Sequence, residues 1–338
     1  MSLFELLRKL IDIPSVTGRE REMARFLAAR LSGSGFEVKS QPVDGERSNI
    51  LAWVGSDPRV IFCTHLDTVP PHRVSSEDDS FIYGRGACDA KGPMAAMIEA
   101  AGRLRGSGVD EVGLLFVVGE ETDSVGAREA EALGLRSEFV VVGEPTGNRL
   151  AVGHKGNLML RLEAEGRSAH SAYPDLGSSA VDKLIDGLQG LRGLDLGTDP
   201  TLGDTLLNIG QIEGGSAPNV VPARASAEVC IRSGRPAAEV LARVKKAVEP
   251  EVRVLVRSQA DPQKLLTVPG FETDVMPYGT DIPHLKGLGK PLLLGPGDGR
   301  DAHTDEEKVA KRQLQEAVGL YEKLARMLLV GKEGGAVG

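Results

Sequence analysis

Apolar runs that end in acidic residues or a histidine are the feature that most constrains the fold of this chain. Five such segments are spread along it: Thr64-His65-Leu66-Asp67, Cys88-Asp89-Ala90-Lys91-Gly92, Gly119-Glu120-Glu121-Thr122, Val142-Gly143-Glu144-Pro145-Thr146 and Ala302-His303-Thr304-Asp305-Glu306-Glu307. Open α/β sheets bind ligands at the carboxyl ends of their strands. The pattern therefore predicts a sheet whose strand ends bring these side chains to one site.

Residues 1 to about 145 alternate between helical and strand patterns. We predict helices at 2–12, 19–32, 91–106 and 124–134, and strands at 49–54, 59–64, 112–118 and 139–143. The continuous apolar runs at 60–63 and 114–118 are typical of central strands that are buried on both faces. These elements predict an α/β fold with a mostly parallel central sheet covered by helices.

After Gly153 the pattern changes to strict alternation of apolar and polar residues, at 158–165 and 223–232, with helical patterns near 178–192 and 236–248. The order of elements is that of a ferredoxin-like βαββαβ plan. We therefore predict a main domain of residues 1–153 and 262–338, with a smaller α/β domain of residues 154–261 inserted into it. The main domain resumes with a strand at 291–294 and a long helix at 305–331, and a disordered tail follows at 334–338.

Charge and composition argue against several classes of partner. The formal net charge is −8 and aromatic residues make up 4% of the chain, whereas nucleic-acid binding requires a basic patch and favours stacking aromatics. No apolar stretch is long enough for a membrane span. Three cysteines without paired spacing fit a reducing compartment. We expect a cytoplasmic protein that binds neither nucleic acid nor membrane.

The five segments contain a ligand set for two divalent metals. If Asp89 bridges them, one metal is bound by His65, Glu144 and Asp89, and the other by His303, Glu121 and Asp89. Each metal then has three protein ligands and an open position for a shared water, as catalytic zinc requires. Two such metals lie ~3.5–4 Å apart and lower the pKa of that water towards ~7.

Two further acidic residues have roles in this scheme. Glu120 is not needed as a ligand and is left as the general base. Asp67, two residues after His65, could hold the second nitrogen of that imidazole. Taken singly, each segment has an ordinary explanation, such as a helix N-cap for Asp89 or a solvated loop for Glu120 and Glu121. Their combination in one predicted domain favours the metal site.

Four segments, at 64–70, 84–92, 119–121 and 143–146, resemble in order the motifs of the dinuclear-zinc amidohydrolase and exopeptidase family. That family includes acetylornithine deacetylase, succinyl-diaminopimelate desuccinylase, aminoacylase and glutamate carboxypeptidase. The resemblance covers essentially the whole chain and implies the same five metal ligands, with Glu120 as base and Asp67 as the residue that orients His65. It implies two divalent metal ions, Zn²⁺ in the first place and Co²⁺ as the alternative.

Segments 89–93, 153–156 and 303–307 are most similar to the N-acetyl-lysine and N-acetylornithine deacetylases of lysine and arginine biosynthesis. The resemblance thus implies hydrolysis of an N-acyl amino acid, free or attached to an amino-group carrier protein. The same metals would also serve a dipeptidase, a carboxypeptidase or a desuccinylase. A binding protein without turnover is the remaining alternative, and the retained Glu120 argues against it.

The inserted domain carries further candidates. Gly166-Arg167-Ser168-Ala169-His170-Ser171 resembles the lid segment of the family, which implies that His170 stabilises the oxyanion in its own or a partner subunit's site. The resemblance also implies a homodimer through this domain. Segment 214–222 resembles a substrate loop, with Asn219 as a hydrogen-bonding residue. Arg232 is a candidate for binding a carboxylate bidentately. Segment 279–281 resembles a substrate-carboxylate loop and adds Gly279 and Thr280.

Overall fold

The computed structural model describes residues 1–330 and contains two compact units. The main unit comprises residues 1–152, 265–274 and the chain from 280 onwards, and the inserted unit comprises residues 153–264 and 275–279. The inserted unit therefore contains a short return segment that the sequence pattern assigned to the main domain. The tail predicted to be disordered, residues 334–338, lies outside the described residues.

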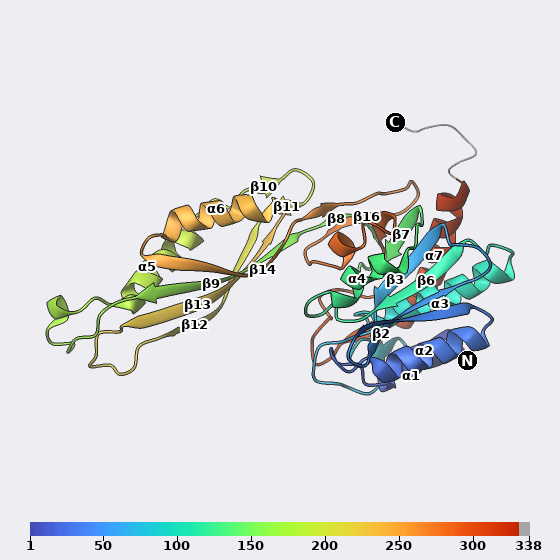
Figure 1. Cartoon of the computed structure of the whole chain (residues 1–338), viewed down its shortest axis with the longest axis horizontal. Coiled ribbons are helices and arrows are strands. Elements are labelled where there is room, and N and C mark those ends of the chain that lie inside the picture. Colours follow the sequence, from blue (N-terminus) through green and yellow to red (C-terminus); the bar gives the residue numbers. More distant parts are fainter. Residues whose placement is uncertain (331–338) are drawn as a thin grey trace. The chain divides into compact units, whose positions relative to one another are not determined.

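The main unit is built on a six-stranded sheet with the order β1-β2-β6-β3-β7-β17. Strands β2, β6, β3 and β7 of this sheet are labelled in Figure 1. Strands β6, β3, β7 and β17 are parallel, and β1 and β2 form an antiparallel pair at the edge beside β6. The strands are β1 (Glu37–Asp44), β2 (Arg47–Trp53), β3 (Val60–His65), β6 (Val112–Val117), β7 (Phe139–Val142) and β17 (Lys290–Leu293). The mostly parallel sheet predicted from the sequence is thus confirmed.

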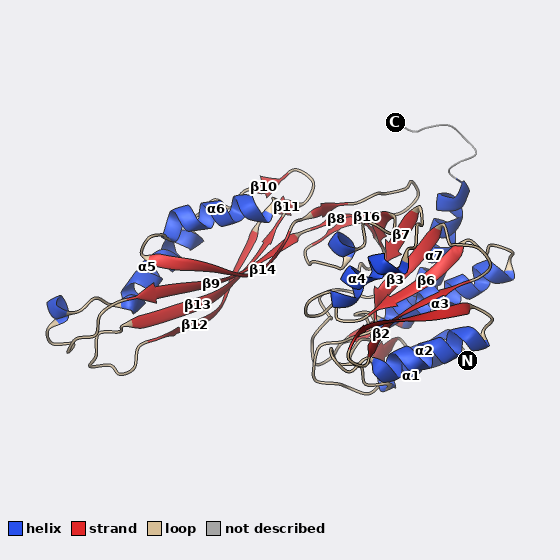
Figure 2. Ribbon diagram, viewed as in Figure 1, coloured by secondary structure: helices blue, strands red, loops and turns tan. Residues whose placement is uncertain are grey.

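Every residue of β3 and of β6 is buried, as expected for central strands covered on both faces. Helices α3 and α7 pack against each other and against β3, and α2 packs on β1 and β2 (Figure 2). The first helix begins with a capping box between Ser2 and Glu5. The helices are α1 (Leu3–Asp12), α2 (Arg21–Gly33), α3 (Lys91–Gly106), α4 (Val125–Ala130) and α7 (Lys311–Val330), with short 3-10 turns at η1 (Glu131–Leu133) and η3 (Ile282–His284).

The last helix begins at Lys311, six residues later than the sequence pattern predicted. The residues before it form strand β18 (Lys308–Ala310), which pairs with β5 (Phe81–Tyr83) beside β4 (Ser76–Glu77). Backbone pairing with a segment more than two hundred residues away therefore replaces the first helical turns. A further small sheet has the order β15-β8-β16, from β8 (Leu150–His154), β15 (Gln263–Lys264) and β16 (Thr273–Met276).

The inserted unit is an antiparallel sheet of order β12-β13-β9-β14 with two helices. Alternate residues of β9, including Leu158, Leu160 and Leu162, are buried in a second apolar core with α5 and α6. The order of elements is the predicted ferredoxin-like plan: β9 (Gly156–Glu165), α5 (Ala180–Arg192), β12 (Leu206–Gly214), β13 (Arg224–Ser233), α6 (Ala237–Val248) and β14 (Val252–Ala260), with η2 (Pro174–Leu176), β10 (Thr198–Asp199) and β11 (Gly203–Asp204) between them.

Within residues 1–330, no helix combines enough residues with enough apolar character to cross a membrane.

Candidate metal centre

Three predicted site segments follow three adjacent strands of the main sheet. His65 is the last residue of β3, Glu120 and Glu121 follow β6, and Glu144 lies two residues after β7. Strand β3 lies between β6 and β7 and is parallel to both, so the three carboxyl ends meet at one edge. The chain passes from β3 to β6 on one side and later to β7 on the other, which is the switch in strand order where such sheets bind ligands.

Two loops complete the group. Asp89 lies just before α3, and His303 lies in the segment that precedes β18. The backbone of His303 has a φ of 64°, a left-handed conformation that is uncommon for residues other than glycine. Such strained positions cost roughly 1–3 kcal/mol and cluster at functional sites. Here the conformation accompanies an imidazole that contacts two carboxylates.

The carboxylate of Asp89 lies between the two histidines. Its Oδ1 is 3.0 Å from Nε2 of His65, and its Oδ2 is 3.2 Å from Nε2 of His303. On the first side, Oε1 of Glu144 is 4.0 Å from His65 Nε2; on the second, Oε2 of Glu121 is 3.0 Å from His303 Nε2. Each oxygen of Asp89 thus lies near a different histidine, and each histidine lies near a different second carboxylate, which is an arrangement that suits a bridging ligand.

These donors could hold a metal. His65, Asp89 and Glu121 each offer a ligand atom within 4.8 Å of the others. Imidazole nitrogens and carboxylate oxygens suit zinc and related divalent metals. Among the described ion pairs of His65 and His303, none involves Glu120. Glu120 therefore differs from Asp89, Glu121 and Glu144, each of which lies within 4.0 Å of a histidine ring nitrogen.

Asp67 connects two of the strand ends. Its carboxylate accepts the backbone N–H groups of Glu120 at 3.1 Å and Glu121 at 3.2 Å, and the hydroxyl of Thr17 at 2.8 Å. The Nδ1 atom of His65 is 3.0 Å from the carbonyl oxygen of Asp67 and 3.6 Å from its Oδ1. Asp67 thus holds the loop after β6 and lies beside the ring nitrogen of His65 that faces away from Asp89. Thr17 was not identified from the sequence.

The buried carboxylates and histidines of this group have shifted pKa values. Burial is the main effect that raises the pKa of Glu120 and Glu144 well above the usual value, and it also raises the pKa of Glu121. Hydrogen bonds that the His303 ring donates to the carboxylates of Asp89 and Glu121 raise the pKa of His303 to about 10. In the metal-free protein, protons therefore offset part of the negative charge. Divalent cations would displace these protons on binding.

Asp281 is a buried carboxylate that sequence analysis did not single out. Burial raises the pKa of Asp281 to about 6, and Asp281 in turn helps to raise the pKa of Glu120 and Glu144. Within residues 1–330, its Oδ1 atom has no hydrogen-bond partner. It is the last residue of segment 279–281, of which sequence analysis named only Gly279 and Thr280, and it lies just before η3. It adds a sixth acidic side chain to the surroundings of the site.

Replacing Asp281 with asparagine should stabilise the metal-free protein, with an effect that depends on pH. Ionisation of Asp281 opposes folding, since its folded pKa of about 6 exceeds the usual aspartate pKa of 3.8. This penalty is absent below pH 3.8 and fully present above about pH 6. There, the difference of about 2 between the folded and unfolded pKa values corresponds to about 3 kcal/mol of unfolding free energy. Urea unfolding at pH 4 and pH 8 measures the difference in the free energy of unfolding between Asp281→Asn and the wild type. Asp79→Asn, at an exposed position, is the control. A stability difference that is the same at both pH values would contradict this prediction.

The remaining candidates lie in the inserted unit or at its border. His170 is exposed; its Nδ1 accepts the backbone N–H of Ala172 at 3.0 Å. The backbone N–H of Ser171 donates to the carbonyl of Asn219 at 3.1 Å, so the two predicted segments lie side by side. The guanidinium of Arg232 lies beside Gly279. Thr280 is the next residue, where the chain re-enters the main unit.

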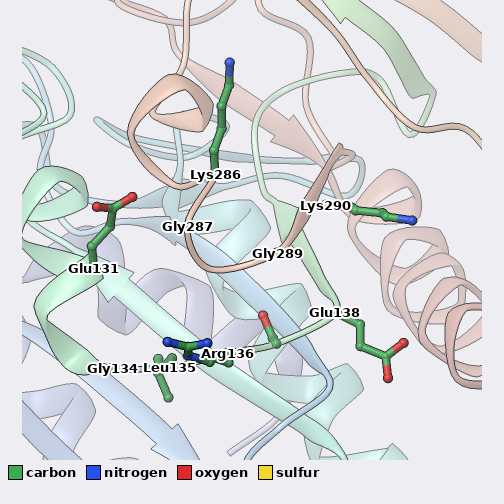
Figure 3. A pocket seen from close by; sticks show the side chains of 10 residues that line it. Glu131, Gly134, Leu135, Arg136, Glu138, Lys286, Gly287, Gly289 and Lys290 are labelled. Carbon is green, nitrogen blue, oxygen red and sulfur yellow. The ribbon is translucent and has the colours of Figure 1, made fainter.

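A cavity of about 620 Å³ lies elsewhere in the main unit (Figure 3). It is lined by residues near the amino ends of β7 and β17, including Glu131, Arg136, Lys286 and Lys290, and by none of the predicted site residues. Figure 3 shows the side chains of Lys286 and Lys290 pointing in different directions rather than towards a common point. The cavity therefore offers no convergent charge that could compete with the strand-end group.

Known proteins are similar to this chain over most of its length. The model of a family described as Peptidase family M20/M25/M40 matches residues 61–327, a range that includes all the predicted site residues. A peptidase M20 domain-containing protein of Schizosaccharomyces pombe is 38% identical over 96% of this chain and 84% of its own length. A probable carboxypeptidase of Aspergillus clavatus is 38% identical over 95% of this chain and 81% of its own length.

A solved structure shares the fold. The chain superposes on a tripeptidase from Staphylococcus aureus with a TM-score of 0.82 at 21% identity, over 96% of this chain and 97% of that one. The family model that matches residues 61–327 and the relatives at 38% identity confirm the family expected from the sequence motifs. The deacetylase branch is not confirmed, because these relatives are named as peptidases or carboxypeptidases.

Proposed function

Since this chain belongs to the peptidase family M20/M25/M40 and is therefore a metal-dependent hydrolase of amide bonds, we propose that it cleaves the amide bond of an N-acyl amino acid at a centre of two divalent metals. Zn²⁺ is the metal proposed first and Co²⁺ the alternative. The observation that carries the proposal is the carboxylate of Asp89, whose two oxygens face His65 and His303 separately. A single shared anion between two histidine–carboxylate pairs fits two metals better than one.

When bound, two such metals would polarise the substrate carbonyl and lower the pKa of a shared water. Glu120 is the proposed base, which takes a proton from the attacking water and delivers it to the leaving amine. Burial and the neighbouring carboxylates raise the pKa of Glu120 above its usual value, which makes its carboxylate a stronger base. Asp67 would keep Glu120 and Glu121 in position through their backbone N–H groups.

His170 is the proposed donor to the oxyanion that forms when the carbonyl is attacked. Its Nδ1 accepts a backbone hydrogen bond, so the neutral ring carries its proton on Nε2 and can donate from that atom. Asn219, whose segment is hydrogen-bonded to that of His170, is the proposed second polar contact to the substrate.

The substrate class follows from the chemistry shared by the candidate activities. A deacetylase and a carboxypeptidase both hydrolyse the amide bond to the nitrogen of an amino acid whose carboxylate is free. They differ in the acyl group that is removed. Arg232, beside Gly279, is the proposed carboxylate receptor, with Thr280 next to it in the chain. A guanidinium suits this role because it binds a carboxylate with two parallel hydrogen bonds.

Among acyl groups, we propose acetyl on ornithine or lysine first, because segments 89–93, 153–156 and 303–307 resemble the deacetylases of arginine and lysine biosynthesis. An N-acyl amino acid attached to an amino-group carrier protein is the alternative substrate. Carboxypeptidase activity is the second candidate, favoured by the name of the Aspergillus clavatus relative.

A substrate panel on metal-loaded protein tests these alternatives. Chelation is expected to abolish hydrolysis, and Zn²⁺ or Co²⁺ to restore it. N-acetyl-L-ornithine and N-acetyl-L-lysine should be turned over at a higher kcat/KM than a set of dipeptides and N-succinyl-diaminopimelate. Preferential cleavage of dipeptides would contradict the proposed deacetylase activity and favour a dipeptidase or carboxypeptidase. Hydrolysis of none of these compounds would contradict the proposed function.

The proposed partner in assembly is a second copy of this chain, bound through the inserted unit. Strand β12 is an edge of its sheet and exposes Leu206 and Ile212. An exposed apolar edge strand pairs readily with another chain. Sedimentation velocity would contradict the dimer if the protein sedimented as a monomer at micromolar concentration.

A further inference from the structure

Glu307 is a buried acidic side chain that contacts the loop carrying Asp89. It follows His303 by four residues, and its side chain is 1% exposed. Its Oε1 accepts the backbone N–H groups of Cys88 and of Asp89, both at 3.2 Å. Its Oε2 accepts from Nη1 of Arg85 at 2.7 Å. Both oxygens of this carboxylate are thus used within the loop that precedes α3.

The contacts of Glu307 extend to its backbone and to a second cation. Its carbonyl oxygen accepts the N–H of Gly84 at 3.0 Å, so the segment is hydrogen-bonded to both ends of the loop. Lys91 is also buried, and it donates a hydrogen bond to the carbonyl of Ile13 at 3.0 Å. The negative charge of Glu307 interacts favourably with the Lys91 ammonium group. Arg85 is 2% exposed, and with Lys91 it offsets a negative charge that would otherwise be buried next to Asp89.

These contacts connect two ligand segments of the proposed metal centre. The backbone N–H of Asp89 is fixed by a residue of the segment that also carries His303, while the carboxylate of Asp89 lies 3.2 Å from the His303 ring. The direction of the Asp89 side chain and the position of His303 therefore depend on the same carboxylate. Outer groups that orient metal ligands in this way typically contribute ~10–100-fold to metal affinity.

We propose that Glu307 is a positioning residue of the metal centre, which holds Asp89 and His303 at the separation that two metals require, with Arg85 as its counter-ion. This inference rests on the proposed function, because it presupposes that Asp89 and His303 bind metal. A purely structural Glu307 would contribute to folding and leave metal affinity unchanged in any variant that folds.

Cobalt titration of the metal-free protein tests this proposal without relying on activity. The Glu307→Gln variant keeps the size of the side chain but removes the charge that pairs with Arg85. Its affinity for Co²⁺ is expected to fall at least ~10-fold, and the visible spectrum of bound cobalt to change because the ligand geometry relaxes. Glu306→Gln is the matched control: the neighbouring side chain is exposed and the charge change is the same.

A second variant keeps the test decisive if Glu307→Gln does not fold. Glu307→Asp retains the charge and shortens the side chain by one methylene, so it cannot contact Arg85 and both backbone N–H groups together. Circular dichroism of the metal-free proteins identifies the variants that fold. A folded Glu307 variant that binds two Co²⁺ ions with wild-type affinity and spectrum would overturn the proposal. Wild-type protein that binds no Co²⁺ would instead overturn the proposed function on which it rests.

Discussion

Replacing Glu120 with glutamine is expected to lower kcat by at least ~10³-fold while both metals stay bound, because a positioned general base contributes ~10²–10⁴-fold to a proton-transfer step. Glutamine has nearly the same size and keeps the backbone N–H that donates to Asp67. Glu120 also makes no ion pair with His65 or His303 among the described residues, so its removal should spare the ligands. Steady-state kinetics and metal analysis of the same preparation measure the two effects.

The control for this variant is Glu129→Gln, which changes the same charge at an exposed position in α4. It should retain wild-type kcat and metal content. If Glu120→Gln lost metal together with activity, Glu120 would be a ligand. If it kept wild-type turnover, the base would have to be another group.

Replacing Asp89 with alanine is expected to release both metals at once. The two oxygens of Asp89 lie 3.0 Å from Nε2 of His65 and 3.2 Å from Nε2 of His303, so Asp89 contacts both halves of the group. The loss should exceed the ~10–100-fold typical of groups that only orient ligands. By contrast, Glu144→Gln should weaken one metal and leave the other, because Glu144 lies on the His65 side alone. Metal content after dialysis, measured by mass spectrometry, distinguishes these outcomes.

An exposed aspartate, Asp79, supplies the control for the loss of one negative charge, and Asp79→Asn should keep both metals. An Asp89→Ala protein that folds and still retains one metal at wild-type affinity would show that Asp89 does not bridge. The centre would then consist of two separate sites with unequal ligand sets.

Much of the secondary structure could be predicted from local sequence patterns. The apolar runs at 60–63 and 114–118 are the buried central strands, and the helix predicted at 91–106 has those bounds. The alternation at 158–165 predicted β9, where one face is buried and the other is not. These predictions succeeded because burial on one or both faces leaves a periodicity of two or a continuous run in the sequence.

Other features left no local signal. Strand β1 at Glu37–Asp44 is largely exposed, so it lacks an apolar pattern. Strand β18 exists only because β5 pairs with it, and the pattern there resembled the start of a helix. Glu307 lies within the helix predicted at 305–331 and Asp281 ends segment 279–281, but neither was singled out, because their burial depends on segments far away in the chain.

The amino-acid sequence by itself determined the types of residue available for chemistry, their order, and the strands after which they come, because ligand motifs and hydrophobic periodicity are local properties. Only the tertiary structure decided that β3 lies between β6 and β7, that the carboxylate of Asp89 has one histidine at each oxygen, and that Glu307 is buried against the Asp89 loop. The physical reason is that distances between side chains, and the desolvation that shifts their pKa values, are set by packing between segments remote in sequence.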